Sequence, residues 1–186
     1  MTSSTNGTTN GGSHSAVMFS SPPSQILTPD EAEAAIQSFC DFLRFETVSR
    51  TAAESGAYQA CATWLVDYVK DVVDTVFLLD EAPEHSPVVI GCWKGRDESL
   101  PVLLLNSHYD VVPAMLEAWT VPPFDAIRKD SKIYGRGTQD MKCVCIQYVE
   151  AIRKIKTLYP DYQPERSIYL TFVPDEGESK NKYSRV

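Results

Sequence analysis

The sequence lacks the features by which several classes of protein are recognised. No Lys or Arg precedes Arg44, and 17 basic residues stand against 25 acidic ones, a formal net charge of -8. Nucleic-acid-binding proteins carry basic patches or arms, so we exclude that class. The longest apolar run near the N-terminus, residues 16–19, is shorter than the roughly 7–15 residues of a signal-peptide core. No run approaches the roughly 20 residues of a membrane span. We therefore expect a cytoplasmic protein without nucleic-acid or membrane partners.

The cysteines do not form a recognisable framework. There are five, an odd number, and no two of them make a C-x-x-C pair. Without a secretory signal, we expect reduced thiols. Cys143 and Cys145 lie two positions apart on a predicted helix, where such residues do not face each other. We therefore expect them to pack inside the helix layer rather than to share a metal ion or a disulfide.

Helical and strand patterns alternate after a polar leader. Residues 1–24 are mostly Ser, Thr, Asn and Gly, a composition that predicts disorder. Thr28, Pro29 and Glu31 have the pattern of a capping box with Pro at the first helical position. Further helices are predicted over residues 57–69 and 141–155, and strands over 73–79, 87–93, 101–112, 132–134 and 167–173. This alternation predicts an α/β fold, a layered sheet with flanking helices.

Residues suited to metal chemistry stand near the ends of these predicted elements. His108 and Asp110 close a strand that is apolar on both faces, typical of a central strand. Their spacing places them on the same side. Asp140 precedes a helix, and Asp175 and Glu176 close the last strand. Zinc binds imidazole and carboxylate groups, and a carboxylate that is not bound to metal can take a proton from water.

Each of these residues also has an ordinary structural interpretation. A single H-x-D pair is commonly a hydrogen-bonded pair, and Asp140 suits a helix N-cap. Residues 175–176 suit a solvated strand end, and residues 135–137, Gly-Arg-Gly, suit a turn. The occurrence of all of them in this order favours a metal site.

Together the motifs resemble the M20 metallopeptidase family of zinc amidohydrolases. The resemblance rests on residues 106–113, Trp119 with Pro123 and Phe124, residues 135–142 and residues 171–176. Residues 143–148 are similar to the aminoacylase branch of that family. The similarity predicts that residues 25–176 form the N-terminal part of an M20 catalytic domain, an incomplete zinc-peptidase-like sheet, and that residues 177–186 are a tail outside it.

The resemblance implies a role for each candidate residue. His108 would bind one zinc ion, and Asp110 would orient His108 through its second ring nitrogen. Asp140 would bridge two zinc ions, and Glu176 would be the general base. The implied substrate is an N-acyl-L-amino acid, and the alternatives within the family are carboxypeptidase, dipeptidase or deacetylase activities. The family's homodimer implies a dimerisation domain, which we expect to lie outside this sequence.

The resemblance breaks at Gly177, where the family has an acidic metal ligand. The first zinc would then have two ligands from this chain, His108 and Asp140, and the second would have one. A catalytic zinc site normally has three protein ligands. We therefore expect little or no hydrolysis by this chain alone. A truncated, non-catalytic product is the alternative to an enzyme.

Overall fold

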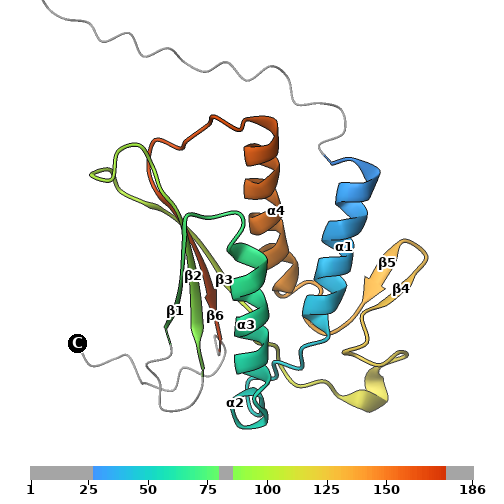
Figure 1. Ribbon diagram of the computed structural model, residues 1–186. Coiled ribbons are helices and arrows are strands. Elements are labelled where there is room, and N and C mark those ends of the chain that lie inside the picture. The colour runs from blue at the N-terminus through green and yellow to red at the C-terminus, as the bar shows by residue number, and fades with distance from the viewer. Residues whose placement is uncertain (1–26, 80–85, 175–186) are drawn as a thin grey trace, which may run out of the picture.

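The computed structural model describes residues 27–79 and 86–174, which form a sheet with helices packed against it (Figure 1). The helices are α1 (Pro29–Leu43), α2 (Ala52–Ser55), α3 (Ala57–Val69) and α4 (Lys142–Leu158), with a 3-10 turn, η1 (Leu116–Ala118). The main sheet contains β1 (Thr75–Leu79), β2 (Val88–Trp93), β3 (Leu103–His108) and β6 (Ile168–Val173), and a hairpin contains β4 (Ile127–Lys129) and β5 (Lys132–Tyr134). The predicted α/β fold is confirmed. The predicted leader and tail lie outside the described residues.

The main sheet has the strand order β1-β2-β6-β3. β3 and β6 run parallel, with His108 opposite Val173, whereas β2 is antiparallel to both of its neighbours. The central position predicted for β3 is wrong for the described residues, because β3 forms an edge and Leu104 is 55% exposed. The predicted strand over residues 101–112 also ends early, at His108, because the chain then leaves the sheet.

The helices cover one face of the main sheet. α3 contacts β1 and β2, α4 contacts β3, and α1 packs on α4 (Figure 1). α1 begins with the predicted capping box: Thr28 N donates to Glu31 Oε2 at 2.7 Å, and Glu31 N donates to Thr28 Oγ1 at 3.3 Å. No helix within the described ranges has the length and apolar character needed to cross a bilayer.

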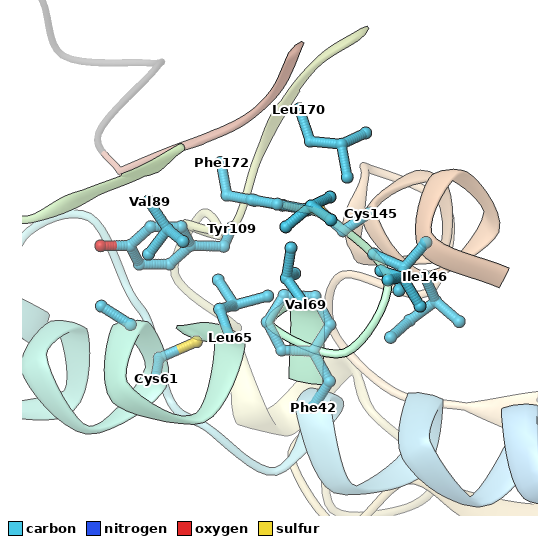
Figure 2. Close-up of a cluster of buried hydrophobic side chains, with 14 of the residues drawn as sticks. Phe42, Cys61, Leu65, Val69, Val89, Tyr109, Cys145, Ile146, Leu170 and Phe172 are labelled. Carbon is cyan, nitrogen blue, oxygen red and sulfur yellow. The ribbon is translucent and has the colours of Figure 1, made fainter. Parts of the chain in front are cut away.

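The core lies between these helices and the sheet (Figure 2). Phe42, Leu65 and Phe172 are fully buried there. Tyr109 is also fully buried, with its ring edge-on to Tyr58 at 5.5 Å between centroids. The Tyr109 hydroxyl donates to Pro87 O at 2.5 Å. The core therefore anchors the residue that separates His108 from Asp110.

Candidate metal centre

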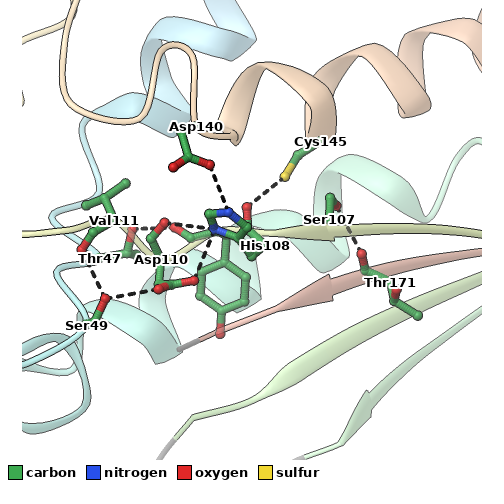
Figure 3. Close-up of polar contacts among 10 residues, drawn as sticks. Thr47, Ser49, Ser107, His108, Asp110, Val111, Asp140, Cys145 and Thr171 are labelled. Atoms are coloured by element: carbon green, nitrogen blue, oxygen red, sulfur yellow. Dashed lines mark hydrogen bonds and ion pairs between the residues drawn. The ribbon is translucent and has the colours of Figure 1, made fainter. Parts of the chain in front are cut away.

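His108 is the last residue of β3 and lies between two carboxylates (Figure 3). Its Nε2 is 3.1 Å from Asp140 Oδ1, and its Nδ1 is 3.2 Å from Asp110 Oδ1. An ionised carboxylate only accepts hydrogen bonds, so the contact with Asp110 places a hydrogen on Nδ1. The structure thus brings together three of the four residues that the sequence predicted. The fourth, Glu176, lies outside the described residues.

The segment after α1 holds Asp110 in place. Val111 N donates to Thr47 O at 2.8 Å, and Ser49 N donates to Val111 O at 3.0 Å, which makes a short parallel bridge between the two segments. Thr47 Oγ1 also donates to Tyr109 O at 2.6 Å. Strand alternation is therefore not what orients Asp110, since β3 has already ended. Contacts between residues about 60 apart do so, and no local sequence pattern indicates them.

Asp140 lies in the loop before α4, and its side chain is 85% exposed. The N-cap of α4 is Met141 and makes no side-chain capping bond. The alternative interpretation of Asp140 as a helix cap is therefore wrong. The turn predicted at residues 135–137 is present, and Gly137 adopts a φ of +91° there. A Cβ on Gly137 would lie 2.9 Å from Val111 Cγ1, so this turn packs closely against the Asp110 segment.

Lys142 fixes the other end of the same loop. Its side chain is fully buried, and its Nζ donates to Phe42 O at 3.0 Å and to Phe45 O at 2.8 Å. These oxygens lie at and just beyond the C-terminal end of α1, where positive charge is favoured. Burial lowers the pKa of Lys142 to about 8. Lys142 belongs to the motif at residues 135–142, but no local sequence pattern indicates this contact.

Cys145 contributes to the packing of α4 rather than to the ligand set. Its buried thiol donates to His108 O at 3.3 Å, and burial raises the pKa of the thiol to about 12. A thiol in this state is inert, since the thiolate is the form that binds metals.

The carboxylates control the charge of His108. The hydrogen bond with Asp110 is the largest influence and raises the pKa of His108 to about 9, against the opposing effect of partial burial, and Asp140 adds a smaller increase. The imidazole is therefore cationic at neutral pH without a metal ion. A metal ion at Nε2 must displace this proton, because a bound imidazole has to offer its lone pair.

A cavity of about 240 Å³ opens beside His108 and Asp140. Arg136 and Trp119 also line it, and the guanidinium carbon of Arg136 is 5.3 Å from the centre of the Trp119 ring. Arg136 Nη2 donates to Pro113 O at 3.3 Å, whereas its Nε is buried without a hydrogen-bond partner in the described part of the chain. The cavity thus has two carboxylates and the His on one side and a fixed guanidinium among its other walls.

The His108–Asp140 pair fits a shared metal ion. Two ligand atoms bound at about 2.1 Å with a near-tetrahedral angle lie roughly 3.4 Å apart, and the observed separation is a little shorter, 3.1 Å. Within residues 27–79 and 86–174, however, no group of three or more His, Cys, Asp or Glu residues is placed to hold a metal ion. The described residues therefore provide part of a ligand set.

Comparison with known proteins shows which family the chain resembles. Residues 104–182 match the family described as Peptidase family M20/M25/M40. Human aminoacylase-1 is 38% identical over 150 residues, which cover 80% of this chain and 35% of that protein. Aminoacylase-1 of Dictyostelium discoideum is 42% identical over 114 residues, covering 55% of this chain and 28% of that protein. A probable carboxypeptidase S-like 1 of the same organism is 49% identical over 85 residues, covering 45% of this chain and 17% of that protein.

Solved structures show the same fold. Human carnosine dipeptidase 1 superposes with a TM-score of 0.68 at 19% identity, covering 80% of this chain and 33% of that one. An M20 family metallo-carboxypeptidase, Sso-CP2 of Sulfolobus solfataricus, superposes with a TM-score of 0.61 at 22% identity. The superposition covers 80% of this chain and 31% of that one.

These matches confirm the predicted resemblance to the M20 metallopeptidase family. Within that family the sequence is similar to aminoacylase-1. The chain spans about a third or less of the length of these curated relatives. The family match ends at residue 182, beyond the boundary predicted at 176, and the division into leader, domain and tail stays a prediction.

Proposed function

We propose that this sequence encodes part of a zinc-dependent amidohydrolase that releases amino acids from N-acyl-L-amino acids. The observation that carries the proposal is the convergence of His108, Asp110 and Asp140 beside one cavity. The similarity to aminoacylase-1 supports the reaction and the substrate class.

The described residues would hold and orient the metal ion. His108 Nε2 and an oxygen of Asp140 would be ligands, while Asp110 keeps the Nδ1 hydrogen of His108 and directs Nε2 toward the cavity. When bound, zinc polarises a carbonyl group and lowers the pKa of bound water towards about 7. Glu176 would take the proton of that water and pass it to the leaving amine.

Arg136 supports a substrate that carries a carboxylate. An N-acyl amino acid has a free α-carboxylate, and a guanidinium recognises such a group with two parallel hydrogen bonds. The stacking on Trp119 and the bond to Pro113 O hold the Arg136 side chain at the cavity wall without consuming all of its donors. We propose that its remaining donors face the substrate carboxylate.

The ligand count supports a further part of the proposal. Within residues 27–79 and 86–174, His108 and Asp140 are two candidate ligands, fewer than the three that a catalytic zinc site normally has. We therefore propose that the 186-residue chain alone binds zinc weakly and hydrolyses little. Peptide substrates are the alternative within the family, favoured by the 49% identity to a carboxypeptidase S-like protein.

The test uses a chimera and the chain alone. In the chimera, residues 27–176 replace the matching part of human aminoacylase-1, and zinc content and release of Met from N-acetyl-L-methionine are measured. We expect bound zinc and turnover that His108→Ala abolishes, with little turnover by the 186-residue chain. Preference of the chimera for a dipeptide over N-acetyl-L-methionine would favour the alternative. A folded chimera without zinc would contradict the proposal.

A further inference from the structure

We propose that Ser49 is a positioning residue for the candidate metal centre, acting on His108 through Asp110. The inference rests on the proposed function in that it takes His108 as a metal ligand. Ser49 Oγ donates to Asp110 Oδ2 at 3.0 Å, and the other oxygen of that carboxylate, Oδ1, is 3.2 Å from His108 Nδ1 (Figure 3). One carboxylate thus connects the serine hydroxyl to the imidazole.

Ser49 has its effect because it and His108 contact different oxygens of the Asp110 carboxylate. The terminal torsion of an Asp side chain is broad, so one contact leaves the plane of the carboxylate free to rotate. A second contact on the other oxygen restricts that rotation. Asp110 is 4% exposed, and hydrogen bonds to a charged group in such surroundings are stronger than those between neutral groups. The Ser49 hydroxyl therefore restricts the direction from which Asp110 holds the Nδ1 hydrogen of His108.

The serine hydroxyl has two acceptors within reach and one hydrogen to donate. Val111 O lies 3.2 Å from Ser49 Oγ, farther than Asp110 Oδ2. Val111 O already accepts a hydrogen bond from Ser49 N at 3.0 Å. The carboxylate is the shorter and the charged acceptor, so the hydroxyl hydrogen is directed to Asp110.

The backbone around Ser49 is itself fixed. The bonds of Thr47 to Tyr109 and Val111 lie on either side of Asp110. The same segment offers Phe45 O to Lys142 Nζ, which holds the loop that carries Asp140. Residues 45–49 thus connect both halves of the candidate centre. Ser49 precedes the family match at residues 104–182 by more than 50 residues, so nothing in that match assigns it a role.

The test compares Ser49→Ala, Ser49→Thr and Ser107→Ala in the full 186-residue chain. Ser49→Thr keeps the hydroxyl. Ser107 is a matched control, because this buried serine next to His108 donates to Thr171 O at 3.0 Å rather than to Asp110. The first measurement is the imidazole N–H resonance of His108 in metal-free protein, followed by proton NMR and identified by its loss in His108→Gln.

We expect the His108 N–H resonance to exchange with water severalfold faster in Ser49→Ala and to be retained in the other two serine variants. The second measurement is zinc affinity by competition with a chromophoric chelator. Loss of a residue that directly orients a metal ligand costs about 10–100-fold in affinity. We therefore expect a loss of roughly 3–10-fold for Ser49, one contact farther from the metal.

The two measurements separate this inference from the proposed function. An unchanged His108 resonance in Ser49→Ala, or the same change in Ser107→Ala, overturns the role of Ser49 whatever the zinc result. Zinc binding that is equal in wild type and Ser49→Ala overturns the role and leaves the proposed function standing. A wild-type chain without measurable zinc binding, together with a changed resonance only in Ser49→Ala, supports the orienting contact and counts against metal binding by this chain.

Discussion

Lys142 Nζ donates to the backbone oxygen of Phe42 at 3.0 Å, so the residue two positions after Asp140 is joined to the last turn of α1. A second bond, to Phe45 O, and a position 4.9 Å from the centre of the Phe42 ring complete the surroundings of the ammonium group. This contact crosses about 100 residues of sequence. It determines where the loop carrying Asp140 lies relative to the segment that orients Asp110.

We expect Lys142→Met to destabilise the fold by about 2 kcal/mol, because one buried and one partly buried carbonyl oxygen lose their donor and each unsatisfied buried group costs roughly 1–3 kcal/mol. The relief from no longer burying a charge offsets part of this loss. The free energy of unfolding in urea measures the effect. Lys154→Met is a control on the same helix, since Lys154 makes an ion pair with Glu31 that is partly exposed, and we expect less than about 1 kcal/mol there. Equal stability of wild type and Lys142→Met would contradict the prediction.

The buried ammonium group also predicts a pH dependence. The pKa of Lys142 is about 8 in the folded chain, against the ordinary value of 10.5. Between these values the unfolded chain binds more protons, so this group makes the fold more stable as pH rises, by at most about 1.4 kcal/mol per pH unit. Burial raises the pKa of the Cys61 and Cys145 thiols, which acts in the opposite direction above pH 9.

The effect of Lys142 is therefore measured as the difference between wild type and Lys142→Met, in which the part of the cysteine contribution that comes from burial, its largest cause, cancels. We expect this difference in the free energy of unfolding to be constant below pH 7.5 and to increase, in favour of wild type, between pH 8 and 10. A flat difference across that range would show that the lysine keeps an ordinary pKa.

The local parts of this structure were predictable, and the contacts between distant segments were not. The capping box at Thr28 and Glu31 is read from four consecutive residues, and it is present. His108 and Asp140 converge as the motifs predicted. The bonds from Ser49 to Asp110 and from Lys142 to Phe45 join residues 61 and 97 apart. Neither has a periodic signal, because a serine or lysine that forms one distant bond is indistinguishable in sequence from one on the surface.

The edge position of β3 shows the same limit. Its leucine run predicts a strand buried on both faces, because an apolar pattern shows what a strand can bury. Pairing partners depend on the rest of the sheet, and among the described strands β3 has only β6. The interpretation of Asp140 as a helix cap is also wrong. The helix α4 starts at Lys142, so its N-cap position falls on Met141 and not on Asp140.

Metal binding by His108 should release a proton. Because the hydrogen bond that His108 donates to Asp110 raises the pKa of His108 to about 9, the imidazole is protonated at pH 7 in the metal-free chain. We expect zinc binding to release close to one proton from His108 at pH 7, and affinity to rise by up to tenfold per pH unit until about pH 9. Calorimetry in two buffers of different ionisation enthalpy measures the proton count. The variant Asp110→Asn lacks the carboxylate, so the number of protons released on zinc binding at pH 7 should fall. Equal proton release in the variant and in wild type would contradict the assignment of the released proton to His108.

Gly137 provides a test of how closely the Asp140 loop must approach the Asp110 segment. Its φ of +91° is unfavourable for residues with a Cβ, and an added methyl would lie 2.9 Å from Val111 Cγ1. Gly56 is a matched control, with a φ of +77° and no atom within 4 Å of an added Cβ. Backbone strain alone costs about 1–2 kcal/mol, so we expect that loss for Gly56→Ala in urea unfolding and a larger one for Gly137→Ala. Zinc affinity should fall only in Gly137→Ala, because the clash separates Asp140 from His108. Equal losses of stability in the two variants would mean that the loop can move away from Val111 at little cost.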